Sequence, residues 1–488
     1  MKLQIKLKMP SLFKQKCWID GEWRGAEETF PVFNPSRGQQ IGEVPKMGTR
    51  ATQDAIEAAA KALPAWRSKT AKERSQILRR WYDLILEHID DLAAILTTEQ
   101  GKPLSEAMQE IRYGASFIEW FSEEAKRVYG DLIPSAIAGQ HLLVMKQPIG
   151  VVGAITPWNF PHAMITRKCA PALAAGCTIV IKPAEATPFS AFALAELGAL
   201  AGIPAGVLNI LTGDPVAIGS EMTRHPLVRK ITFTGSTRVG KLLMSQCAST
   251  VKKITLELGG SAPFIVFDDA NLDDAVEGLI ASKFRNSGQA CICADRVFVQ
   301  KRIYEPFLEK FTKAVRTLKM GDGFEPGVQQ GPLINTAALE KVESHVKDAV
   351  SKGATIVCGG KRHPLGKTFY EPTILCNVTR QMEIMREETF GPVAPIMSFD
   401  TESEAISMAN DTQYGLGSYL FSSDIDRIWR VSEALEFGMV SINGGIFSNE
   451  VAPFGGVKES GIGREGSKYG ILDYLEIKYL CMTASSNK

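Results

Sequence analysis

The run of small and polar residues from 285 to 293 holds the side chain best suited to covalent chemistry, the thiol of Cys291. Gly288 and Ala290 leave room for a substrate carbonyl and expose backbone N–H groups near the sulfur. A free thiol has a pKa of about 8.5, so it reacts only where the local field favours thiolate. Arg285, in the same run, would supply positive potential. The alternative interpretation of Cys291 is a small buried packing residue.

Polar side chains also follow several short apolar segments between residues 150 and 260. They are Asn159 after 150–155, Lys182 and Glu185 after 177–181, Gly235 and Ser236 after 228–233, and Glu257 within 254–258. Helical patterns separate these segments, at about 162–175, 188–201, 216–223 and 236–248. The alternation predicts a parallel, doubly wound sheet, in which ligands bind at the carboxyl ends of the strands. We therefore expect the polar side chains to share one edge.

Each group has a chemical interpretation and a plainer alternative. Ser236 begins a helix at the phosphate-binding position of a dinucleotide fold, or is only a helix cap. Glu185 accepts from a ribose 2′-hydroxyl and repels a 2′-phosphate, or forms a surface ion pair with Lys182. Glu257, in an apolar setting, has a raised pKa and acts as a general base, or is a solvated strand end. The Asn159 amide suits an oxyanion.

Composition excludes several classes of protein. The 488 residues are 45% hydrophobic and 22% charged with a net charge of +1, so there is room for two or three domains and no basic surplus for nucleic acid. Nine scattered cysteines without a C-x-x-C pair indicate a reducing, cytoplasmic compartment. The histidines have no metal-ligand spacing, and no apolar run reaches the roughly 18 residues of a membrane span. Residues 1–17 are expected to form a solvated tail.

The remaining pattern places these groups in an α/β chain. We expect a hairpin at 18–23, helices over 52–126 with a break at 101–103, and a glycine-rich loop over 453–466. A second α/β region covers 263–444, with strands at 264–267, 296–299, 355–357, 394–397 and 439–442. Residues 134–146 predict a hairpin that leaves the main body. Residues 475–480 alternate like an exposed strand, which would pair with that hairpin or with another chain.

Five segments, in order along the chain, resemble the signature segments of the NAD(P)-dependent aldehyde dehydrogenase superfamily. They are residues 156–161 (TPWNFP), 256–260 (LELGG), 288–291 (GQAC), 387–392 (EETFGP) and 453–456 (PFGG). Within the superfamily the chain most resembles succinate-semialdehyde dehydrogenases. That resemblance rests on residues 164–168 (MITRK), 282–286 (SKFRN), the pair Cys291 and Cys293, Ser448, and 463–470 (GREGSKYG).

The resemblance implies a fold of two doubly wound parallel-sheet domains with a small β-flap for oligomerisation. Residues 1–130 and 148–259 would form the dinucleotide-binding domain, residues 260–460 the catalytic domain, and residues 131–147 with 471–488 the flap. It also implies the catalytic roles. Cys291 attacks the aldehyde, and the Asn159 amide with the Cys291 backbone N–H holds the oxyanion. Hydride passes to a nicotinamide, and Glu257 activates the water that hydrolyses the thioester. Lys168 and Glu465 would relay the proton.

The implied cofactor and substrate contacts are carried over residue by residue. The cofactor contacts are Trp158, Lys182, Pro183, Ala184, Glu185, Gly235, Ser236, Gly240, Glu388 at the nicotinamide ribose and Phe390 at the nicotinamide. Arg167, Arg285 and Ser448 would bind the distal carboxylate of the substrate, unless the arginines form structural ion pairs. Glu185 stands where NADP-preferring members carry a small residue, so NAD is favoured and NADP remains possible. Cys293 resembles the partner in a reversible disulfide, a strained and labile bridge, or is a packing residue.

The sequence therefore predicts an enzyme that oxidises succinate semialdehyde to succinate with NAD(P)+. Glutarate semialdehyde or another short ω-carboxy aldehyde is the alternative substrate. A cysteine hydrolase or acyltransferase using Cys291 with Glu257, or a non-catalytic relative, would belong to other classes; the strand-end groups argue against both. The expected partner is a small carboxylated aldehyde, without nucleic acid or membrane. Pairing of edge strands predicts a homodimer or homotetramer.

Overall fold

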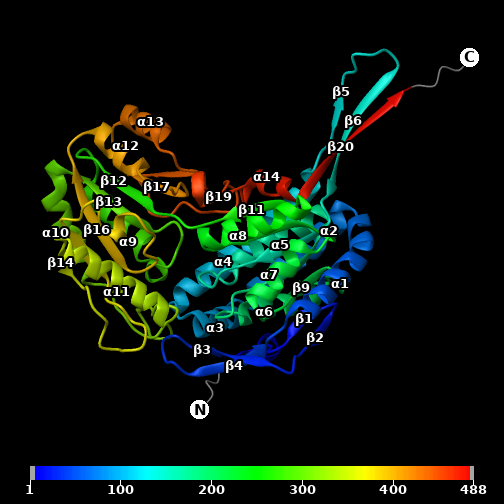
Figure 1. Ribbon diagram of the computed structural model, residues 1–488, viewed down its shortest axis with the longest axis horizontal. Coiled ribbons are helices and arrows are strands. Elements are labelled where there is room, and N and C mark those ends of the chain that lie inside the picture. Colours follow the sequence, from blue (N-terminus) through cyan, green and yellow to red (C-terminus); the bar gives the residue numbers. More distant parts are fainter. Residues whose placement is uncertain (1–5, 484–488) are drawn as a thin grey trace, which may run out of the picture.

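A computed structural model describes residues 6–483 of the protein. Two lobes lie side by side, each built on its own β-sheet, and a narrow flap projects from one of them (Figure 1). This arrangement confirms the predicted α/β class with two mainly parallel sheets and a small β-flap. Within residues 6–483, no helix combines the length and apolar character that a bilayer span requires.

The first lobe is built on an eight-stranded sheet of order β19-β11-β10-β7-β8-β9-β1-β2. Its strands are β1 (Cys17–Ile19), β2 (Glu22–Arg24), β7 (Val151–Ile155), β8 (Thr178–Lys182), β9 (Leu208–Ile210), β10 (Val228–Thr234), β11 (Lys253–Glu257) and β19 (Gly461–Ile462). The five central strands are parallel, whereas β1, β2 and β19 join the edges antiparallel. The predicted hairpin of β1 and β2 turns at Asp20 and Gly21, which both have positive φ, as a two-residue turn requires.

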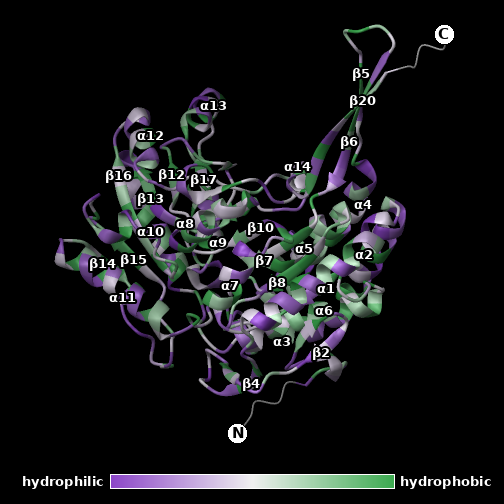
Figure 2. Cartoon of the chain, turned by 45° about the vertical axis from the view of Figure 1, so that its right-hand side comes forward, coloured by the Kyte–Doolittle hydropathy of each residue, from purple (hydrophilic) through white to green (hydrophobic). Residues whose placement is uncertain are grey.

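The helices packed around this sheet are α1 (Thr49–Ser68), α2 (Ala71–Glu87), α3 (Ile89–Gln100), α4 (Leu104–Glu124), α5 (Ala163–Ala175), α6 (Phe189–Ala201), α7 (Pro215–Arg224) and α8 (Thr237–Cys247). Helices α1, α5, α6, α7 and α8 contact its strands, whereas α2, α3 and α4 form an outer layer on α5 and α6. A capping box between Thr70 and Glu73 starts α2, and Gly101, at φ 94°, ends α3 at the first residue of the predicted break. Helix α5 is buried along its whole length, while α1 and α2 show mixed hydropathy at the surface (Figure 2).

The second lobe is built on a seven-stranded sheet of order β14-β15-β16-β13-β12-β17-β18. Its strands are β12 (Ala262–Val266), β13 (Ala294–Gln300), β14 (Thr355–Cys358), β15 (Thr373–Cys376), β16 (Val393–Phe399), β17 (Gly417–Phe421) and β18 (Met439–Ile442). Its helices are α9 (Leu272–Lys283), α10 (Tyr304–Val315), α11 (Thr336–Ser351), α12 (Glu402–Asn410) and α13 (Ile425–Ala434). All its strand pairs are parallel except β14 with β15. Strands β15 and β17 were not among the five predicted strands of this region.

The flap is a three-stranded sheet of β5 (Asp131–Ile133), β6 (Gln140–Pro148) and β20 (Leu475–Thr483), in the order β20-β6-β5. Strand β20 runs antiparallel to β6 from Leu475 opposite Pro148 to Thr483 opposite Gln140. Of the two partners expected for the C-terminal strand, the structure selects the hairpin of the same chain. Between the second lobe and the flap, the chain returns to the first lobe through β19 and the short helix α14 (Ser467–Gly470).

The N-terminal segment packs on the first lobe, so the expectation of a solvated tail is wrong for residues 6–16. Leu12 is fully buried, and the Phe13 ring lies 4.4 Å from that of Phe189. The backbone N–H of Met9 donates to Asp91 Oδ2 over 2.8 Å. The prediction gave weight to the lysines of this segment and overlooked Leu12 and Phe13, the apolar residues that pack on the lobe. Residues 1–5 lie outside the described residues; a two-stranded ribbon of β3 (Thr29–Phe33) and β4 (Gln40–Pro45) follows β2.

Candidate active site

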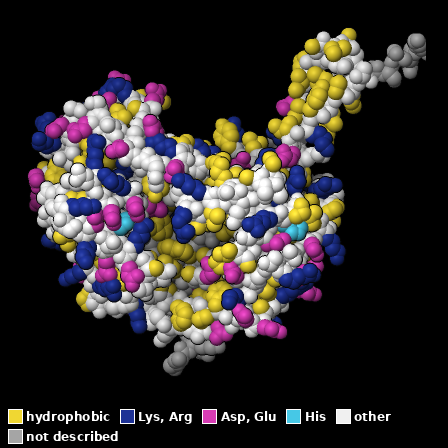
Figure 3. All heavy atoms as spheres, viewed as in Figure 1, with side chains coloured by type: hydrophobic (Ala, Val, Ile, Leu, Met, Phe, Trp, Pro, Cys, Tyr) yellow, Lys and Arg dark blue, Asp and Glu magenta, His cyan; other side chains and the backbone are white. Residues whose placement is uncertain are grey.

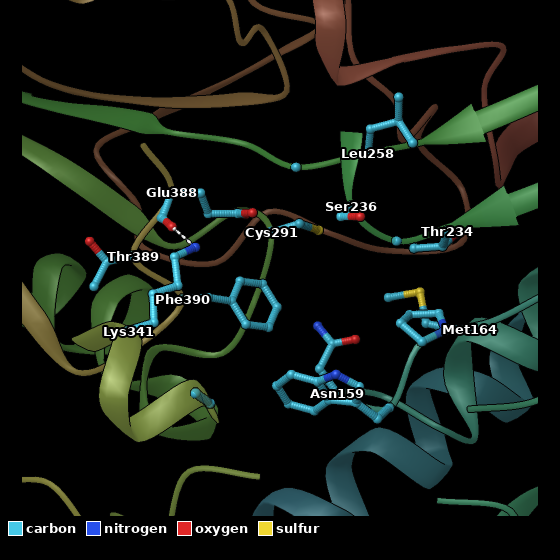
Figure 4. A pocket seen from close by; sticks show the side chains of 15 residues that line it. Asn159, Met164, Thr234, Ser236, Leu258, Cys291, Lys341, Glu388, Thr389 and Phe390 are labelled. Atoms are coloured by element: carbon cyan, nitrogen blue, oxygen red, sulfur yellow. Dashed lines mark hydrogen bonds between the residues drawn. The ribbon is translucent and has the colours of Figure 1, made fainter. Parts of the chain in front are cut away.

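A cavity of about 270 Å³ opens where the strand ends of the first sheet face the second lobe. Its lining is Pro157, Trp158, Asn159, Met164, Thr234, Gly235, Ser236, Leu258, Gly259, Cys291, Ala338, Lys341, Glu388, Thr389 and Phe390 (Figure 4). The structure therefore brings together seven of the predicted site residues: Trp158, Asn159, Gly235, Ser236, Cys291, Glu388 and Phe390. Cys291 and Asn159 lie across the same space, although they come from different lobes.

Backbone geometry holds the segment that carries Cys291. Asn286 and Ser287 both have positive φ, at 51° and 56°. A Cβ on Gly288 would lie 2.1 Å from the Gly391 carbonyl oxygen, so only glycine fits there. After Cys291, the buried Tyr419 hydroxyl donates to the Ile292 carbonyl over 2.7 Å. The sulfur thus sits on a tightly turned segment with little freedom to move.

The field around Cys291 leaves its thiol protonated at neutral pH. Burial raises the pKa of Cys291 above its usual range, and the nearby Glu388 carboxylate acts in the same direction. The cation that opposes this shift is Arg167. Arg285, which we expected to supply the positive potential, instead has its guanidinium carbon 5.0 Å from the centre of the Phe160 ring. For Cys291 to act as a nucleophile, its thiol must therefore lose its proton to a base, or an approaching positive charge must lower its pKa.

Two carboxyl groups in a second cluster have pKa values shifted in opposite directions. Burial raises the pKa of Glu257 well above its usual range, and the negative charge of Glu465 raises it further. Burial acts the same way on Glu465, but Lys168 and Arg167 overcome it and hold the pKa of Glu465 below its usual range. Lys168 Nζ lies 2.5 Å from Glu465 Oε1, and Arg167 Nη2 lies 2.8 Å from Oε2. Two acids whose environments separate their pKa values suit a proton relay.

The cavity fits a nicotinamide dinucleotide. Ser236 caps α8 with its hydroxyl, and a Cβ on Gly240 would lie 2.4 Å from Leu258 Cδ2, so α8 approaches the end of β11 this closely only with glycine. Trp158 and Phe390 meet edge to face at 5.5 Å, which leaves an apolar slot. These features supply a helix N-terminus for phosphate and a flat pocket for an aromatic ring.

Two carboxylates lie where a dinucleotide's riboses would be expected. Glu388 is in the cavity, where burial raises its pKa to about 8 and its Oε1 accepts from the Gly260 N–H over 3.1 Å. Glu185 is at the end of β8, outside the cavity lining, together with Lys182, Pro183 and Ala184. Its side chain is 44% exposed and hydrogen-bonds the buried Lys182 ammonium. The predicted ion pair is thus present, and Glu185 remains accessible to a hydroxyl.

The predicted substrate residues converge through aromatic side chains. Arg167 is buried in an ion pair with Glu465, which is the alternative expected for it, and its Nη1 donates to the Tyr113 hydroxyl over 3.3 Å. That hydroxyl is hydrogen-bonded to Ser448 Oγ. Tyr113 also packs against a buried cluster that includes Phe160, the ring over which Arg285 lies. The cluster is formed by Phe160, Ala163, Met164, Ala290 and Cys293.

Several residues of the site escaped the sequence analysis. They are Tyr113, Lys102, Glu110, Met164, Lys341 and Thr389. Tyr113 joins Arg167 to Ser448 across the chain, and Lys102 contacts the Asn159 backbone. Met164 and Thr389 stand in two of the segments that carried the resemblance, without having been singled out there, whereas Tyr113, Lys102, Glu110 and Lys341 lie outside every such segment. Among residues 6–483 no group of three or more histidine, cysteine and acidic side chains could hold a metal ion.

Two α/β lobes that enclose a cavity with a helix N-terminus and an apolar slot fit the class of cofactor-dependent oxidoreductases. The model of the aldehyde dehydrogenase family matches residues 23–480, and the chain belongs to that family, whose members use NAD or NADP.

Relatives named for the oxidation of semialdehydes match over nearly their whole length. A succinate-semialdehyde dehydrogenase [NADP(+)] of Escherichia coli is 60% identical over 98% of this chain and 100% of its own. A glutarate-semialdehyde dehydrogenase of Pseudomonas aeruginosa is 59% identical over 98% and 99%. The crystal structure of succinate-semialdehyde dehydrogenase from Burkholderia pseudomallei has a TM-score of 0.97 and 61% identity, covering 98% of this chain and 100% of that one.

Proposed function

We propose that the protein oxidises succinate semialdehyde to succinate with NAD(P)+ through a covalent intermediate on Cys291. The observation that carries this proposal is the pair of guanidiniums near the nucleophile: Arg167, joined to Ser448 through Tyr113, and Arg285 over Phe160. Two guanidiniums and a hydroxyl suit a carboxylate at the far end of a short aldehyde. The relatives named for succinate semialdehyde and glutarate semialdehyde support the same substrate class.

The chain's own residues supply each proton and charge in this reaction. Once the Cys291 thiol has given its proton to a base, the thiolate attacks the aldehyde carbon and gives a thiohemiacetal, whose oxyanion takes hydrogen bonds from the Asn159 amide and the Cys291 N–H. A bound nicotinamide dinucleotide would accept a hydride from that carbon. Glu257 then removes a proton from the water that hydrolyses the resulting thioester, releasing the acid and the thiol. Lys168 and Glu465 pass the proton onward.

Within NAD(P), we propose a preference for NAD. Glu185 supports it, because a carboxylate accepts from a 2′-hydroxyl and repels a 2′-phosphate. The Escherichia coli relative is named for NADP(+), so NADP is tested beside NAD. The proposed contacts are Trp158, Gly235, Ser236, Glu388 and Phe390 in the cavity lining, together with Lys182, Pro183, Ala184, Glu185 and Gly240.

The proposal extends to domains and assembly. Residues 1–130 and 148–259 would bind the dinucleotide, residues 260–460 would carry the nucleophile, and residues 131–147 with 471–488 would join subunits of a homodimer or homotetramer in a reducing, cytoplasmic compartment. The flap supports the assembly, because it exposes apolar side chains on a projecting surface (Figure 3). They are Leu132, Ile133, Ile137, Ile477 and Tyr479. Light scattering that finds only monomer would contradict this assembly.

Glutarate semialdehyde is the second candidate substrate, favoured by the 59% identity to the Pseudomonas aeruginosa enzyme. A panel of four-carbon and five-carbon semialdehydes and their neutral analogues, each with NAD and NADP, tests both. We expect the highest kcat/KM for succinate semialdehyde with NAD. Equal values for the two acids would remove the narrow assignment, and a neutral aldehyde as best substrate would remove the carboxylate site. Thioester hydrolysis without aldehyde-dependent cofactor reduction would favour a hydrolase instead.

A further inference from the structure

Lys102 is buried between helices α3 and α4 and contacts the loop that carries the oxyanion amide. Its side chain is 1% exposed. The ammonium donates to Glu110 Oε2 over 2.6 Å and to the main-chain carbonyl of Asn159 over 2.8 Å. It also lies 3.9 Å from the centre of the Phe160 ring. Burial lowers the pKa of Lys102, and the Glu110 carboxylate acts against that shift.

The same Asn159 carbonyl is tied to the segment that carries the nucleophile. Asn286 Nδ2 donates to it over 3.0 Å and to the Gln289 carbonyl over 3.2 Å. The Asn159 side chain, in turn, donates from Nδ2 to the Gln289 carbonyl over 3.0 Å. One N–H of the Asn159 amide is therefore engaged and the plane of the amide is set, which leaves the second N–H for the cavity shared with Cys291.

Further contacts anchor both sides of this arrangement to the same helix corner. Glu110 Oε1 accepts from the backbone N–H groups of His162 and Ala163, at 3.0 and 3.3 Å, where α5 begins. Glu106 Oε2 accepts from the Asn286 N–H over 2.9 Å. The start of α4 thus fixes the oxyanion loop and the nucleophile segment relative to each other. Lys102 itself does not line the cavity, so it acts through Asn159.

We propose that Lys102 is a positioning residue. With Glu110 and Asn286 it holds the backbone of Asn159, so that the free N–H of the Asn159 side-chain amide meets the oxyanion formed when Cys291 attacks. This inference rests on the proposed function and deepens it. The Asn159 amide stabilises the oxyanion in the transition state. Removal of the Lys102 contact that positions this amide therefore lowers kcat and leaves KM for the cofactor unchanged.

The test uses Lys102→Met, the double variant K102M/E110Q, and Lys252→Met as a matched control. Lys102→Met alone strands a buried carboxylate and is expected to lower the melting temperature. The double variant removes both charges and restores much of the stability, yet still lacks the donor to Asn159. Lys252 likewise donates to two backbone carbonyls, of His225 and Val228, but outside the site, so its loss leaves kcat unchanged.

Two activities are measured on each folded variant: oxidation of succinate semialdehyde, and hydrolysis of 4-nitrophenyl acetate without cofactor. The ester uses the same thiol and oxyanion donor but no hydride transfer. We expect K102M/E110Q to lose roughly 10- to 100-fold of kcat in both, somewhat less than removal of an oxyanion donor itself.

Wild-type kcat in the double variant would overturn the proposal, because the hydrogen bond from Lys102 to Asn159 would then be unnecessary for catalysis. A change confined to KM would overturn it too. A wild-type enzyme that does not oxidise the semialdehyde but hydrolyses the ester in a manner dependent on Lys102 would retain this inference and refute the proposed substrate.

Discussion

Lys168 Nζ lies 2.5 Å from Glu465 Oε1 in a setting where both side chains are almost completely buried. The two residues are 297 positions apart in the chain. Their pairing keeps Glu465 ionised, and that negative charge makes ionisation of the neighbouring Glu257 harder. The pKa of Glu465 is therefore lowered and the pKa of Glu257 is raised, which suits Glu257 to exchange the proton.

Glu257→Gln should separate the two halves of the reaction. The amide keeps the size of the side chain but cannot take a proton from water, so hydrolysis of the thioester slows by about 10²-fold or more. We expect a burst of one reduced cofactor per subunit, followed by slow turnover, in stopped-flow absorbance. Loss of the burst together with turnover would show that Glu257 acts before the thioester forms, as the base for the buried Cys291 thiol.

The raised pKa of Glu257 also predicts a pH dependence. As a base the group must be deprotonated, so the rate of hydrolysis rises with pH through its raised pKa. Folding has the opposite dependence: protonation favours the native state, and this stabilisation is lost as pH rises through the folded-state pKa. Glu257→Gln should flatten the kcat profile and be relatively more stable than wild type at alkaline pH in thermal melts. A profile unchanged by the substitution would contradict this role.

Glu185→Ser should shift the cofactor preference toward NADP. The substitution removes the carboxylate that would repel a 2′-phosphate and frees the Lys182 ammonium, now its hydrogen-bond partner. We expect the ratio of kcat/KM for NADP to that for NAD to rise roughly tenfold or more. The exposed Glu309, on α10, provides a matched control, and Glu309→Ser should leave the ratio unchanged. An unaltered ratio in Glu185→Ser would place the ribose contact elsewhere.

Arg285→Met should weaken binding of carboxylated aldehydes while sparing neutral ones. A hydrogen bond to a charged group contributes about 1.5–3 kcal/mol, so kcat/KM for succinate semialdehyde should fall roughly 10- to 150-fold. Butanal, which lacks the carboxylate, is the substrate control, and the exposed Arg316→Met is the variant control. Equal losses for both aldehydes would assign Arg285 a structural role.

Cys293→Ala tests the redox interpretation of the second thiol. Cys293 is free and 2% exposed, and it belongs to the apolar cluster beside Tyr113. If Cys293 protects Cys291 by forming a disulfide, wild-type activity lost to peroxide should return with dithiothreitol. The activity of Cys293→Ala should not return, because Cys291 would then be oxidised to the sulfinic acid, which dithiothreitol does not reduce. Equal recovery in both proteins would leave Cys293 as a packing residue.

The sequence predicted the parallel strands of the first sheet because each is a short apolar run between helical patterns. It did not predict β19, which has only two residues, or β15 and β17, whose flanks lack a clear change of period. Strand β17 is buried throughout, so no alternation marks it. Edge and centre strands of this kind are defined by their neighbours rather than by their own residues.

The candidate site shows the same division. Cys291 and Asn159 stand in segments whose local pattern already suggests chemistry, and the cavity brings them together. Lys102 and Tyr113 carry no such pattern, because their partners lie 57 and 335 positions away. Arg285 shows the opposite case. Its nearness to Cys291 in the sequence predicted that it would lower the pKa of the thiol, whereas in the fold Arg167 is the arginine that does so. Contacts of this range arise only from the tertiary arrangement.

The return of the chain through β19, Glu465 and β20 has a consequence for synthesis. Ribosomes deliver residues 461–483 after both lobes, so a nascent chain already contains Cys291 and the dinucleotide cavity but lacks the carboxylate that pairs with Lys168 and the third strand of the flap. The buried Lys168 ammonium therefore stays without its Glu465 partner until this closing segment is translated and packs against the first lobe.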